Sequence, residues 1–142
     1  MNKEKLADNL LIYLPIMLKN LTKNYPNINI TKQQFDLLNK IFKDNKKTMS
    51  YYSKVILISK PNLTIIADKL IKEELIKRCF DPSDRRVILL EITEKGILRL
   101  NEYKIQIRNN VLNAFSNLDD EHVKKLNDIV EELKTRIDKM NI

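Results

Sequence analysis

Between residues 59 and 93 the spacing of apolar residues changes from helical to alternating, and this change limits the folds open to the chain. Apolar side chains first recur every three or four residues, at Leu63, Ile66, Ala67 and Leu70. After Leu75 they alternate with their neighbours, which predicts strands over 76–80 and 87–92. The run Asp81-Pro82-Ser83-Asp84-Arg85-Arg86 between them has the composition of a turn. The sequence therefore predicts a helix over 59–75 followed by a charged hairpin.

A second, shorter helix is predicted directly before this one. Thr48 is expected to cap it, and its inward-facing residues are expected to be Tyr52, Val55 and Ile56. Ser59 is expected to cap the next helix through its hydroxyl, and Pro61 suits the first helical turn because no N–H is needed there. A helix, a turn, a second helix and a hairpin are typical of a winged helix-turn-helix. In that fold the second helix enters the major groove of DNA and the hairpin reaches the minor groove.

Residue chemistry indicates how such a surface divides its contacts with DNA. Phosphate contacts supply affinity, and base contacts supply specificity. On the predicted helix we expect contacts from Lys60, Asn62, Thr64, Ile65 and Lys69, with the Ile65 side chain against a thymine methyl. Strand alternation separates Arg85 from Arg86, so one is expected to enter the minor groove while the other pairs with Asp81 or Asp84 to stabilise the wing. An ordinary solvated helix face would carry a similar set of polar residues.

Composition excludes several other classes of protein. The 142 residues suit one domain, and a single Gly with four Pro argues against sandwiches, barrels and Gly-rich phosphate loops. One His and one Cys leave no metal site, cofactor site or catalytic constellation, so we expect no enzyme. The net charge of +7 favours a polyanionic partner, and the excess lies within residues 1–93. A mainly α fold with a small β-wing follows.

Cysteine usage and hydropathy indicate a cytoplasmic protein. The lone Cys79 excludes an internal disulfide, and its place in a strand favours buried packing over a redox sensor. The apolar run over residues 10–18 is too short to span a bilayer and is interrupted by Pro15. We therefore expect no membrane association.

Helices are expected on both sides of this lobe. They are predicted over about 5–25, from a capping box of Thr31 and Gln34 onward, over 93–117, and from Asp119 onward. In the helix after Thr31 the expected buried face is Phe35, Leu38, Ile41 and Phe42. A small lobe cannot cover the apolar stripes of the terminal helices, so a second copy is expected to cover them. The expected dimer interface is Leu6, Leu10, Tyr13, Met17, Val123, Leu126, Val130, Leu133, Ile137 and Met140.

Three motifs carry a resemblance to a known family. They are Ser59-Lys60-Pro61-Asn62-Leu63-Thr64, Asp81-Pro82-Ser83-Asp84-Arg85-Arg86 and Thr93-Glu94-Lys95-Gly96. The chain resembles the multiple antibiotic resistance regulator (MarR) family. The resemblance implies one domain over 1–142, with a DNA-binding lobe at 31–93 and dimerisation helices at 1–28 and 95–142. It also implies that the residues matching the family motifs contact DNA or stabilise the wing, namely Ser59, Lys60, Pro61, Thr64, Asp84, Arg85 and Arg86.

The resemblance further implies a homodimeric transcriptional regulator, expected to be a repressor, on a pseudo-palindromic operator. Its release would come from a small hydrophobic or phenolic effector, or from thiol oxidation. The candidate pocket residues are Tyr13, Met17, Leu38 and Phe42, all of which are equally well explained as core. Leu57 and Glu74 stand where the family often has Gly, and a left-handed backbone at either would cost on the order of 1 kcal/mol. The alternative is a winged-helix protein-interaction module that no longer binds DNA.

Overall fold

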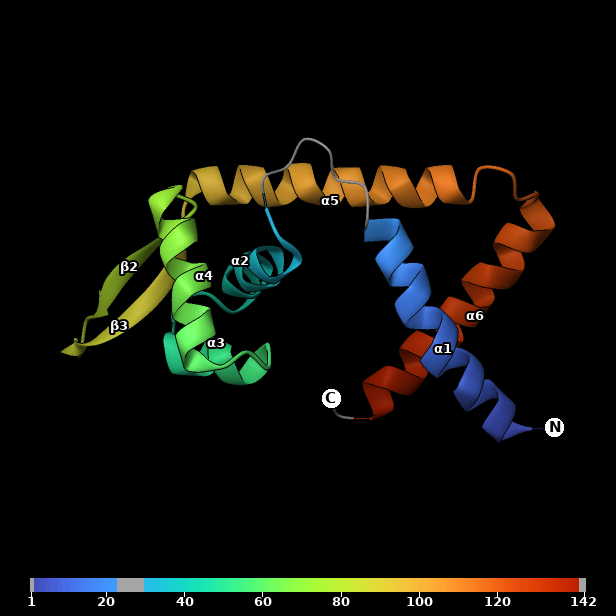
Figure 1. Ribbon diagram of the computed structural model, residues 1–142, viewed down its shortest axis with the longest axis horizontal. Coiled ribbons are helices and arrows are strands. Elements are labelled where there is room, and N and C mark those ends of the chain that lie inside the picture. Colours follow the sequence, from blue (N-terminus) through green and yellow to red (C-terminus); the bar gives the residue numbers. More distant parts are fainter. Residues whose placement is uncertain (1, 23–29, 141–142) are drawn as a thin grey trace. The chain divides into compact units, whose positions relative to one another are not determined.

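A computed structural model describes residues 2–22 and 30–140 (Figure 1). The elements run α1 Lys3–Thr22, α2 Lys32–Asp44, β1 Lys47–Thr48, α3 Met49–Val55, α4 Lys60–Lys72, β2 Ile76–Asp81, β3 Asp84–Ile92, α5 Glu94–Ala114 and α6 Asp120–Lys139. The chain forms two compact units, one over Thr22–Ile107 and one joining Met1–Leu21 to Arg108–Ile142. The predicted mainly helical fold with a small β-wing is confirmed.

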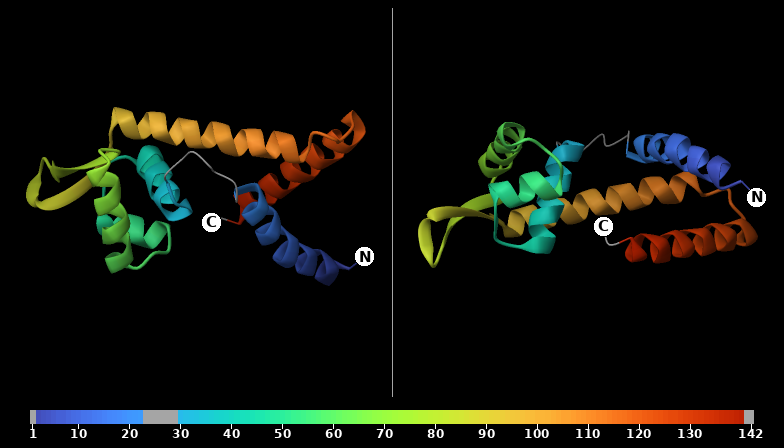
Figure 2. Two further views of the ribbon diagram at one scale, coloured as in Figure 1. Left: turned by 45° about the horizontal axis from the view of Figure 1, so that its top comes forward. Right: turned by 90° about the horizontal axis from the view of Figure 1, so that it is seen from below.

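The sheet of the first unit is antiparallel, with the strand order β1-β3-β2. Strands β2 and β3 form the wing, which projects from the helices of its unit (Figure 2). Its register pairs Ile76 with Ile92 and Phe80 with Ile88, and the turn between the strands is Pro82-Ser83. Strand β3 begins at Asp84, three residues earlier than predicted. The two-residue strand β1 was not predicted, because a segment so short has no period to detect.

The core of this unit lies between α2, α3, α4 and the sheet. The predicted stripe of α4 is confirmed, since Leu63, Ile66, Ala67 and Leu70 are all buried. The prediction for α2 is partly wrong. Its buried residues are Gln34, Leu37, Leu38 and Ile41, whereas Phe42 is 45% exposed. Val55 is also exposed, at 41%, because it ends α3 beyond the core, while Tyr52 is fully buried as predicted.

The predicted helix caps at Thr31 and Thr48 are confirmed, and the structure adds one at Asp119. The hydroxyls of Thr31 and Thr48 accept from the backbone N–H groups of Gln34 and Tyr51, and the Asp119 carboxylate accepts from that of His122. The predicted cap at Ser59 is wrong, because its side chain makes no capping hydrogen bond. Pro61, the second residue of α4, has no N–H to donate, and the Ser59 hydroxyl does not accept from Asn62, the third residue, either.

Two connections beside α4 have left-handed backbone at residues with a side chain. Leu57, between α3 and α4, has φ 57°, and Glu74, between α4 and β2, has φ 61°. The hydroxyl of Ser53 donates to the carbonyl of Ile58 at 2.5 Å and so holds the first of these turns. The backbone is thus left-handed at both positions where the MarR family often has glycine.

Glycine at either position is expected to stabilise the chain. Leu57→Gly and Glu74→Gly should each raise the free energy of unfolding by about 0.5–1 kcal/mol, because relief of about 1–2 kcal/mol of left-handed strain exceeds the entropic cost of glycine. Urea unfolding would measure this, with Leu57→Ala and Glu74→Ala as controls that keep the β-carbon. Equal stability of the Ala and Gly variants would contradict a role for backbone strain.

In the second unit, α1 and α6 expose most of their apolar side chains. No residue of α6 is buried. A hollow of about 500 Å³ is lined by apolar residues of α1, α5 and α6 that include Leu21, Phe115 and Val130. The amide of Asn110 on α5 donates to the carbonyl of Leu21 at 3.4 Å. Among the described helices, none combines the length and apolar character needed to cross a bilayer.

Candidate nucleic-acid interface

The exposed face of α4 carries the residues predicted to contact DNA. Ser59, Lys60, Pro61, Asn62, Thr64, Ile65 and Lys69 are all exposed, and the Ile65 side chain is 68% exposed. The Asn62 amide makes no hydrogen bond with the described residues, so its donors and acceptor are available to a base edge. The Thr64 hydroxyl donates to the carbonyl of Lys60 at 3.0 Å, which leaves it free only to accept.

An ion pair joins this face to the wing. The Arg78 guanidinium lies 2.6 Å from the Asp68 carboxylate, so β2 is tied to the middle of α4. The pair also neutralises the one carboxylate on the exposed face of α4, which would otherwise repel phosphate. Sequence reasoning missed this contact, because it depends on the tertiary position of β2. The only available signal was the alternation that places Arg78 on the same side of the strand as the buried Ile76.

Two carboxylates shape the tip of the wing. Asp81 accepts from the Ser83 hydroxyl at 2.6 Å and from its backbone N–H at 2.9 Å. These bonds lower the pKa of Asp81, with the hydroxyl as the larger cause. Asp84 accepts from the backbone N–H and side chain of Arg86, at 3.0 and 3.1 Å, and its pKa is lowered chiefly by the Arg86 side chain. Both carboxylates are therefore ionised at neutral pH and hold the turn.

The two wing arginines differ as the alternation predicted. The Arg86 guanidinium pairs with Asp84, whereas that of Arg85 has no ion pair or hydrogen bond with the described residues. Arg85 is exposed and borders an open hollow with Phe80, Asp81 and Pro82. Of the two, Arg85 is thus the arginine whose charge is available to a partner.

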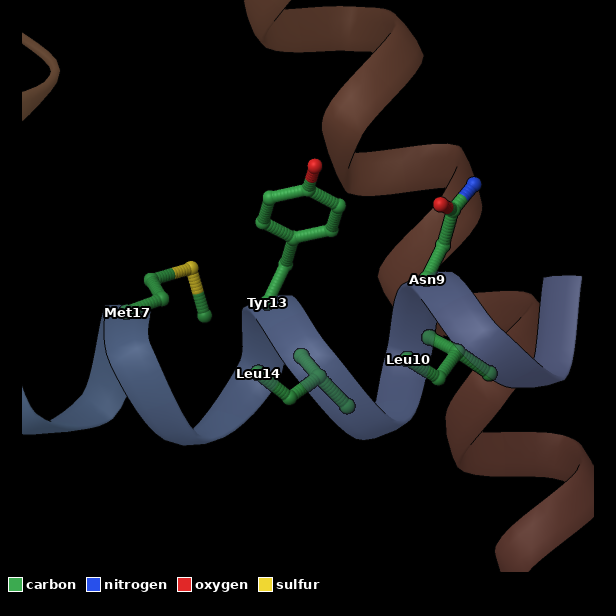
Figure 3. Close-up of a pocket in the computed structure, with 5 residues that line it drawn as sticks. All are labelled: Asn9, Leu10, Tyr13, Leu14 and Met17. Atoms are coloured by element: carbon green, nitrogen blue, oxygen red, sulfur yellow. The ribbon is translucent and has the colours of Figure 1, made fainter. Parts of the chain in front are cut away.

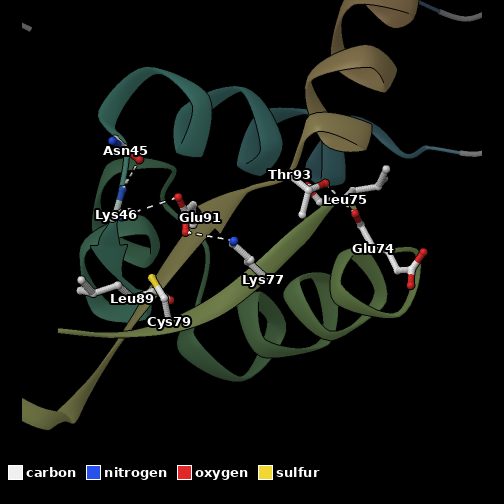
Figure 4. Close-up of polar contacts among 9 residues, drawn as sticks. All are labelled: Asn45, Lys46, Glu74, Leu75, Lys77, Cys79, Leu89, Glu91 and Thr93. Carbon is white, nitrogen blue, oxygen red and sulfur yellow. Dashed lines mark hydrogen bonds and ion pairs between the residues drawn. The ribbon is translucent and has the colours of Figure 1, made fainter. Parts of the chain in front are cut away.

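A carboxylate on β3 links the wing to the end of α2. Glu91 lies 3.6 Å from the ammonium of Lys46 and 3.7 Å from that of Lys77 (Figure 4). On the same sheet, Cys79 is half-buried and its Sγ lies 3.7 Å from the carbonyl of Leu89. Among the described residues, no group of His, Cys, Asp or Glu side chains could hold a metal ion.

Two tyrosines anchor α3 to the end of α2. The Tyr51 hydroxyl donates to the Asp44 carboxylate at 2.6 Å, and this bond is the main cause that lowers the pKa of Asp44. The Tyr52 hydroxyl donates to the carbonyl of Asn45 at 2.9 Å. Burial raises the pKa of Tyr52 to about 12, so its phenol keeps the proton that this bond requires. These bonds position α3, on which the turn into α4 depends.

The motif Thr93-Glu94-Lys95-Gly96 joins the wing to α5. The Thr93 hydroxyl donates to the carbonyl of Glu74 at 2.6 Å and accepts from the N–H of Gly96 at 3.0 Å. Gly96 is buried, and a β-carbon there would lie 2.0 Å from the carbonyl oxygen of Leu75. The only glycine of the chain thus allows α5 to pass against the start of β2.

Comparison with known proteins identifies the family of this chain. Residues 17–103 match the family described as transcriptional regulator SarA/Rot. The chain belongs to the SarA/Rot family. The fold that the MarR resemblance implied is confirmed as well, because solved structures with the same fold include MarR from E. coli and a MarR family protein from Bacillus stearothermophilus, each 22% identical. These relatives are transcriptional regulators and not enzymes, as the sequence predicted.

Individual relatives define the extent of the similarity. The transcriptional regulator MhqR of Bacillus subtilis is 35% identical over 69 residues, which cover 49% of this chain and 48% of MhqR. The chain therefore spans about half the length of the curated relatives it matches. The transcriptional regulator Tm0710 of Thermotoga maritima is 27% identical, with a TM-score of 0.77 over 96% of each chain. A MarR mutant from E. coli, solved with operator DNA, is 21% identical to this chain. The alignment covers 94% of this chain and 99% of the MarR chain, with a TM-score of 0.64.

The residues of this SarA/Rot chain that were predicted for an effector pocket and for a dimer interface are divided between the two units. Tyr13 and Met17 line a shallow hollow along α1 (Figure 3). Leu38 is fully buried in the winged-helix core, and the ring of Phe42 lies 5.4 Å from the Lys104 ammonium. Among the residues predicted for a dimer interface, Leu10 and Leu133 are partly exposed, and the exposed ones are Leu6, Tyr13, Met17, Val123, Leu126, Val130, Ile137 and Met140.

Proposed function

We propose that this SarA/Rot-family chain binds double-stranded DNA sequence-specifically, with α4 in the major groove and the wing in the adjacent minor groove. The observation that carries the proposal is the unpaired Arg85 guanidinium, on a wing that Arg78 and Asp68 tie to the polar face of α4. A mutant of E. coli MarR with the same fold has been solved with operator DNA, which supports DNA as the partner of this chain.

The proposed contacts follow the chemistry of the exposed side chains. Asn62 and Thr64 face base edges, and Ile65 meets a thymine methyl. Lys60 and Lys69 neutralise phosphates, while the N-terminus of α4 at Ser59 and Pro61 adds a helix dipole that favours them. On the wing, Arg85 enters the minor groove, and Asp81, Asp84 and Arg86 maintain the shape of the turn.

The proposed active form is a homodimer that represses transcription from a pseudo-palindromic operator. The large exposed apolar area of α1 and α6 supports this, because a second copy would remove it from water. Two recognition helices would then lie about 34–36 Å apart, one turn of DNA. A small hydrophobic or phenolic effector would release the operator, and Tyr13 and Met17, which line the hollow along α1, are its candidate contacts.

A salt series of duplex binding tests the proposal. The wild-type chain is titrated with its best duplex from a random pool and with a scrambled duplex, between 50 and about 200 mM salt. Binding through phosphate neutralisation predicts a steep linear fall of log K with log salt, and sequence reading predicts tighter binding to the selected duplex. Absence of duplex binding would favour the alternative, a winged-helix module that recognises a protein.

The two wing arginines are expected to behave differently on substitution. Arg85→Ala should weaken binding about tenfold to a hundredfold and reduce the salt slope, because it removes an unpaired cation from the interface. Arg86→Ala should weaken binding with a smaller change of slope, because that charge is already paired with Asp84. Neither should lower the unfolding midpoint appreciably, since both side chains are exposed. Identical salt slopes for both variants and the wild type would contradict the assignment of Arg85.

A further inference from the structure

The wing carries an apolar surface that the charge-based contacts leave unused. Phe80 and Ile88 are directly paired across β2 and β3, and they are 65% and 43% exposed. Strand alternation puts them on the same face as Ile76 and Arg78, the face on which Arg78 reaches Asp68 of α4. The pair therefore continues the inner face of the hairpin beyond the core, on the side of the recognition helix.

Phe80 of this apolar pair adjoins the available wing cation. Phe80, Pro82 and Arg85 border one open hollow of about 600 Å³. Asp81 borders it as well, but its Oδ1 accepts two hydrogen bonds from Ser83. The other acidic groups of the hairpin are Asp84 and Glu91, and each is paired with a cation. The hollow thus combines an aromatic ring and a proline with one unpaired guanidinium, and Ile88 lies beside the aromatic ring across the two strands.

The geometry points to the DNA minor groove as the occupant of this surface. We propose that Phe80 and Ile88 pack against the deoxyribose walls of the groove that Arg85 enters. Proteins that bind the minor groove combine arginine with apolar side chains such as Phe, Ile and Pro, because the groove has apolar sugar walls and a strongly negative floor. An apolar protein partner would not require the unpaired cation. This inference rests on the proposed DNA-binding function.

The test compares Phe80→Ala and Ile88→Ala with a matched control, Phe42→Ala, which makes the same truncation at a partly exposed phenylalanine of α2. Each full-length variant is titrated with the selected duplex, and the bound duplex is footprinted with hydroxyl radicals, which report access to the minor-groove sugars. Dimethyl sulfate footprinting of guanine N7 reports major-groove contact by α4. Thermal unfolding verifies that each variant is folded.

Phe80→Ala is expected to weaken binding about tenfold, in proportion to the apolar area it loses, with an unchanged salt slope. It should also expose minor-groove sugars at the wing position while guanine N7 stays protected. Ile88→Ala should have a smaller effect in the same direction, and Phe42→Ala should leave both footprints as in the wild type. Wild-type affinity and wild-type sugar protection for Phe80→Ala would overturn this inference and leave the proposed function standing. Failure of the wild-type chain to bind any duplex would overturn both.

Discussion

Gly96→Ala is expected to lower the free energy of unfolding by about 3 kcal/mol, because the added methyl group has no room. The added β-carbon would lie 2.0 Å from the backbone oxygen of Leu75 and 2.8 Å from a side-chain carbon of Ile92. No rotamer change relieves a clash between a β-carbon and backbone, so α5 must move away from β2. That movement would also break the bonds from Thr93 to Glu74 and Leu75.

Helix propensity alone predicts the opposite sign for this substitution. Alanine is favoured over glycine inside a helix by about 1 kcal/mol, so an uncrowded Gly96→Ala variant would be more stable than the wild type. Urea unfolding distinguishes the two outcomes, with Lys95→Ala as a control at the exposed neighbouring position. A Gly96→Ala variant as stable as the wild type would show that the close approach to Leu75 does not constrain α5.

Leu133→Asp is expected to abolish tight operator binding without touching α4 or the wing. In the proposed dimer Leu133 lies in the middle of the α6 seam, and burying a charge there would cost several kcal/mol at the interface. The single chain should keep its winged-helix unit, because Leu133 lies outside it. Sedimentation measures the oligomeric state, and the salt series measures the accompanying loss of affinity.

The control for this substitution is Thr135→Asp, which adds the same charge to an exposed position of α6 off the seam. It should remain dimeric and bind the duplex as the wild type does. A wild-type chain that sediments as a 16.8 kDa monomer at micromolar concentration, yet binds a palindromic duplex tightly, would refute the dimer. A Leu133→Asp variant that stays dimeric would remove α6 from the proposed interface.

The division between Arg85 and Arg86 shows how far a local pattern can predict a site. Alternation along a strand required the two side chains to diverge, and turn chemistry placed Asp81 and Asp84 within reach of their neighbours. The structure confirmed a pairing of Arg86 with Asp84 at 3.1 Å. The predicted cap at Ser59 is wrong although Asn62 keeps its N–H, so a favourable residue type at the start of a helix does not by itself determine a cap.

The sequence by itself determined the features that depend on neighbours within a few residues. These are the buried stripe of α4, the capping box of Thr31 and Gln34 and the turn of the wing. Each follows from a helical period or from the local preferences of cap and turn residues, so the pattern carries the information without the fold.

Only the tertiary structure decided features that join distant segments. They include the pairing of β1 with β3, the contact of Arg78 with Asp68, the exposure of Phe42 and the approach of Gly96 to Leu75. The motif Thr93-Glu94-Lys95-Gly96 could be recognised from the sequence, but the reason for its glycine could not. That reason is a backbone carbonyl 21 positions earlier, which comes close only when β2 and β3 pair and α5 begins beside them.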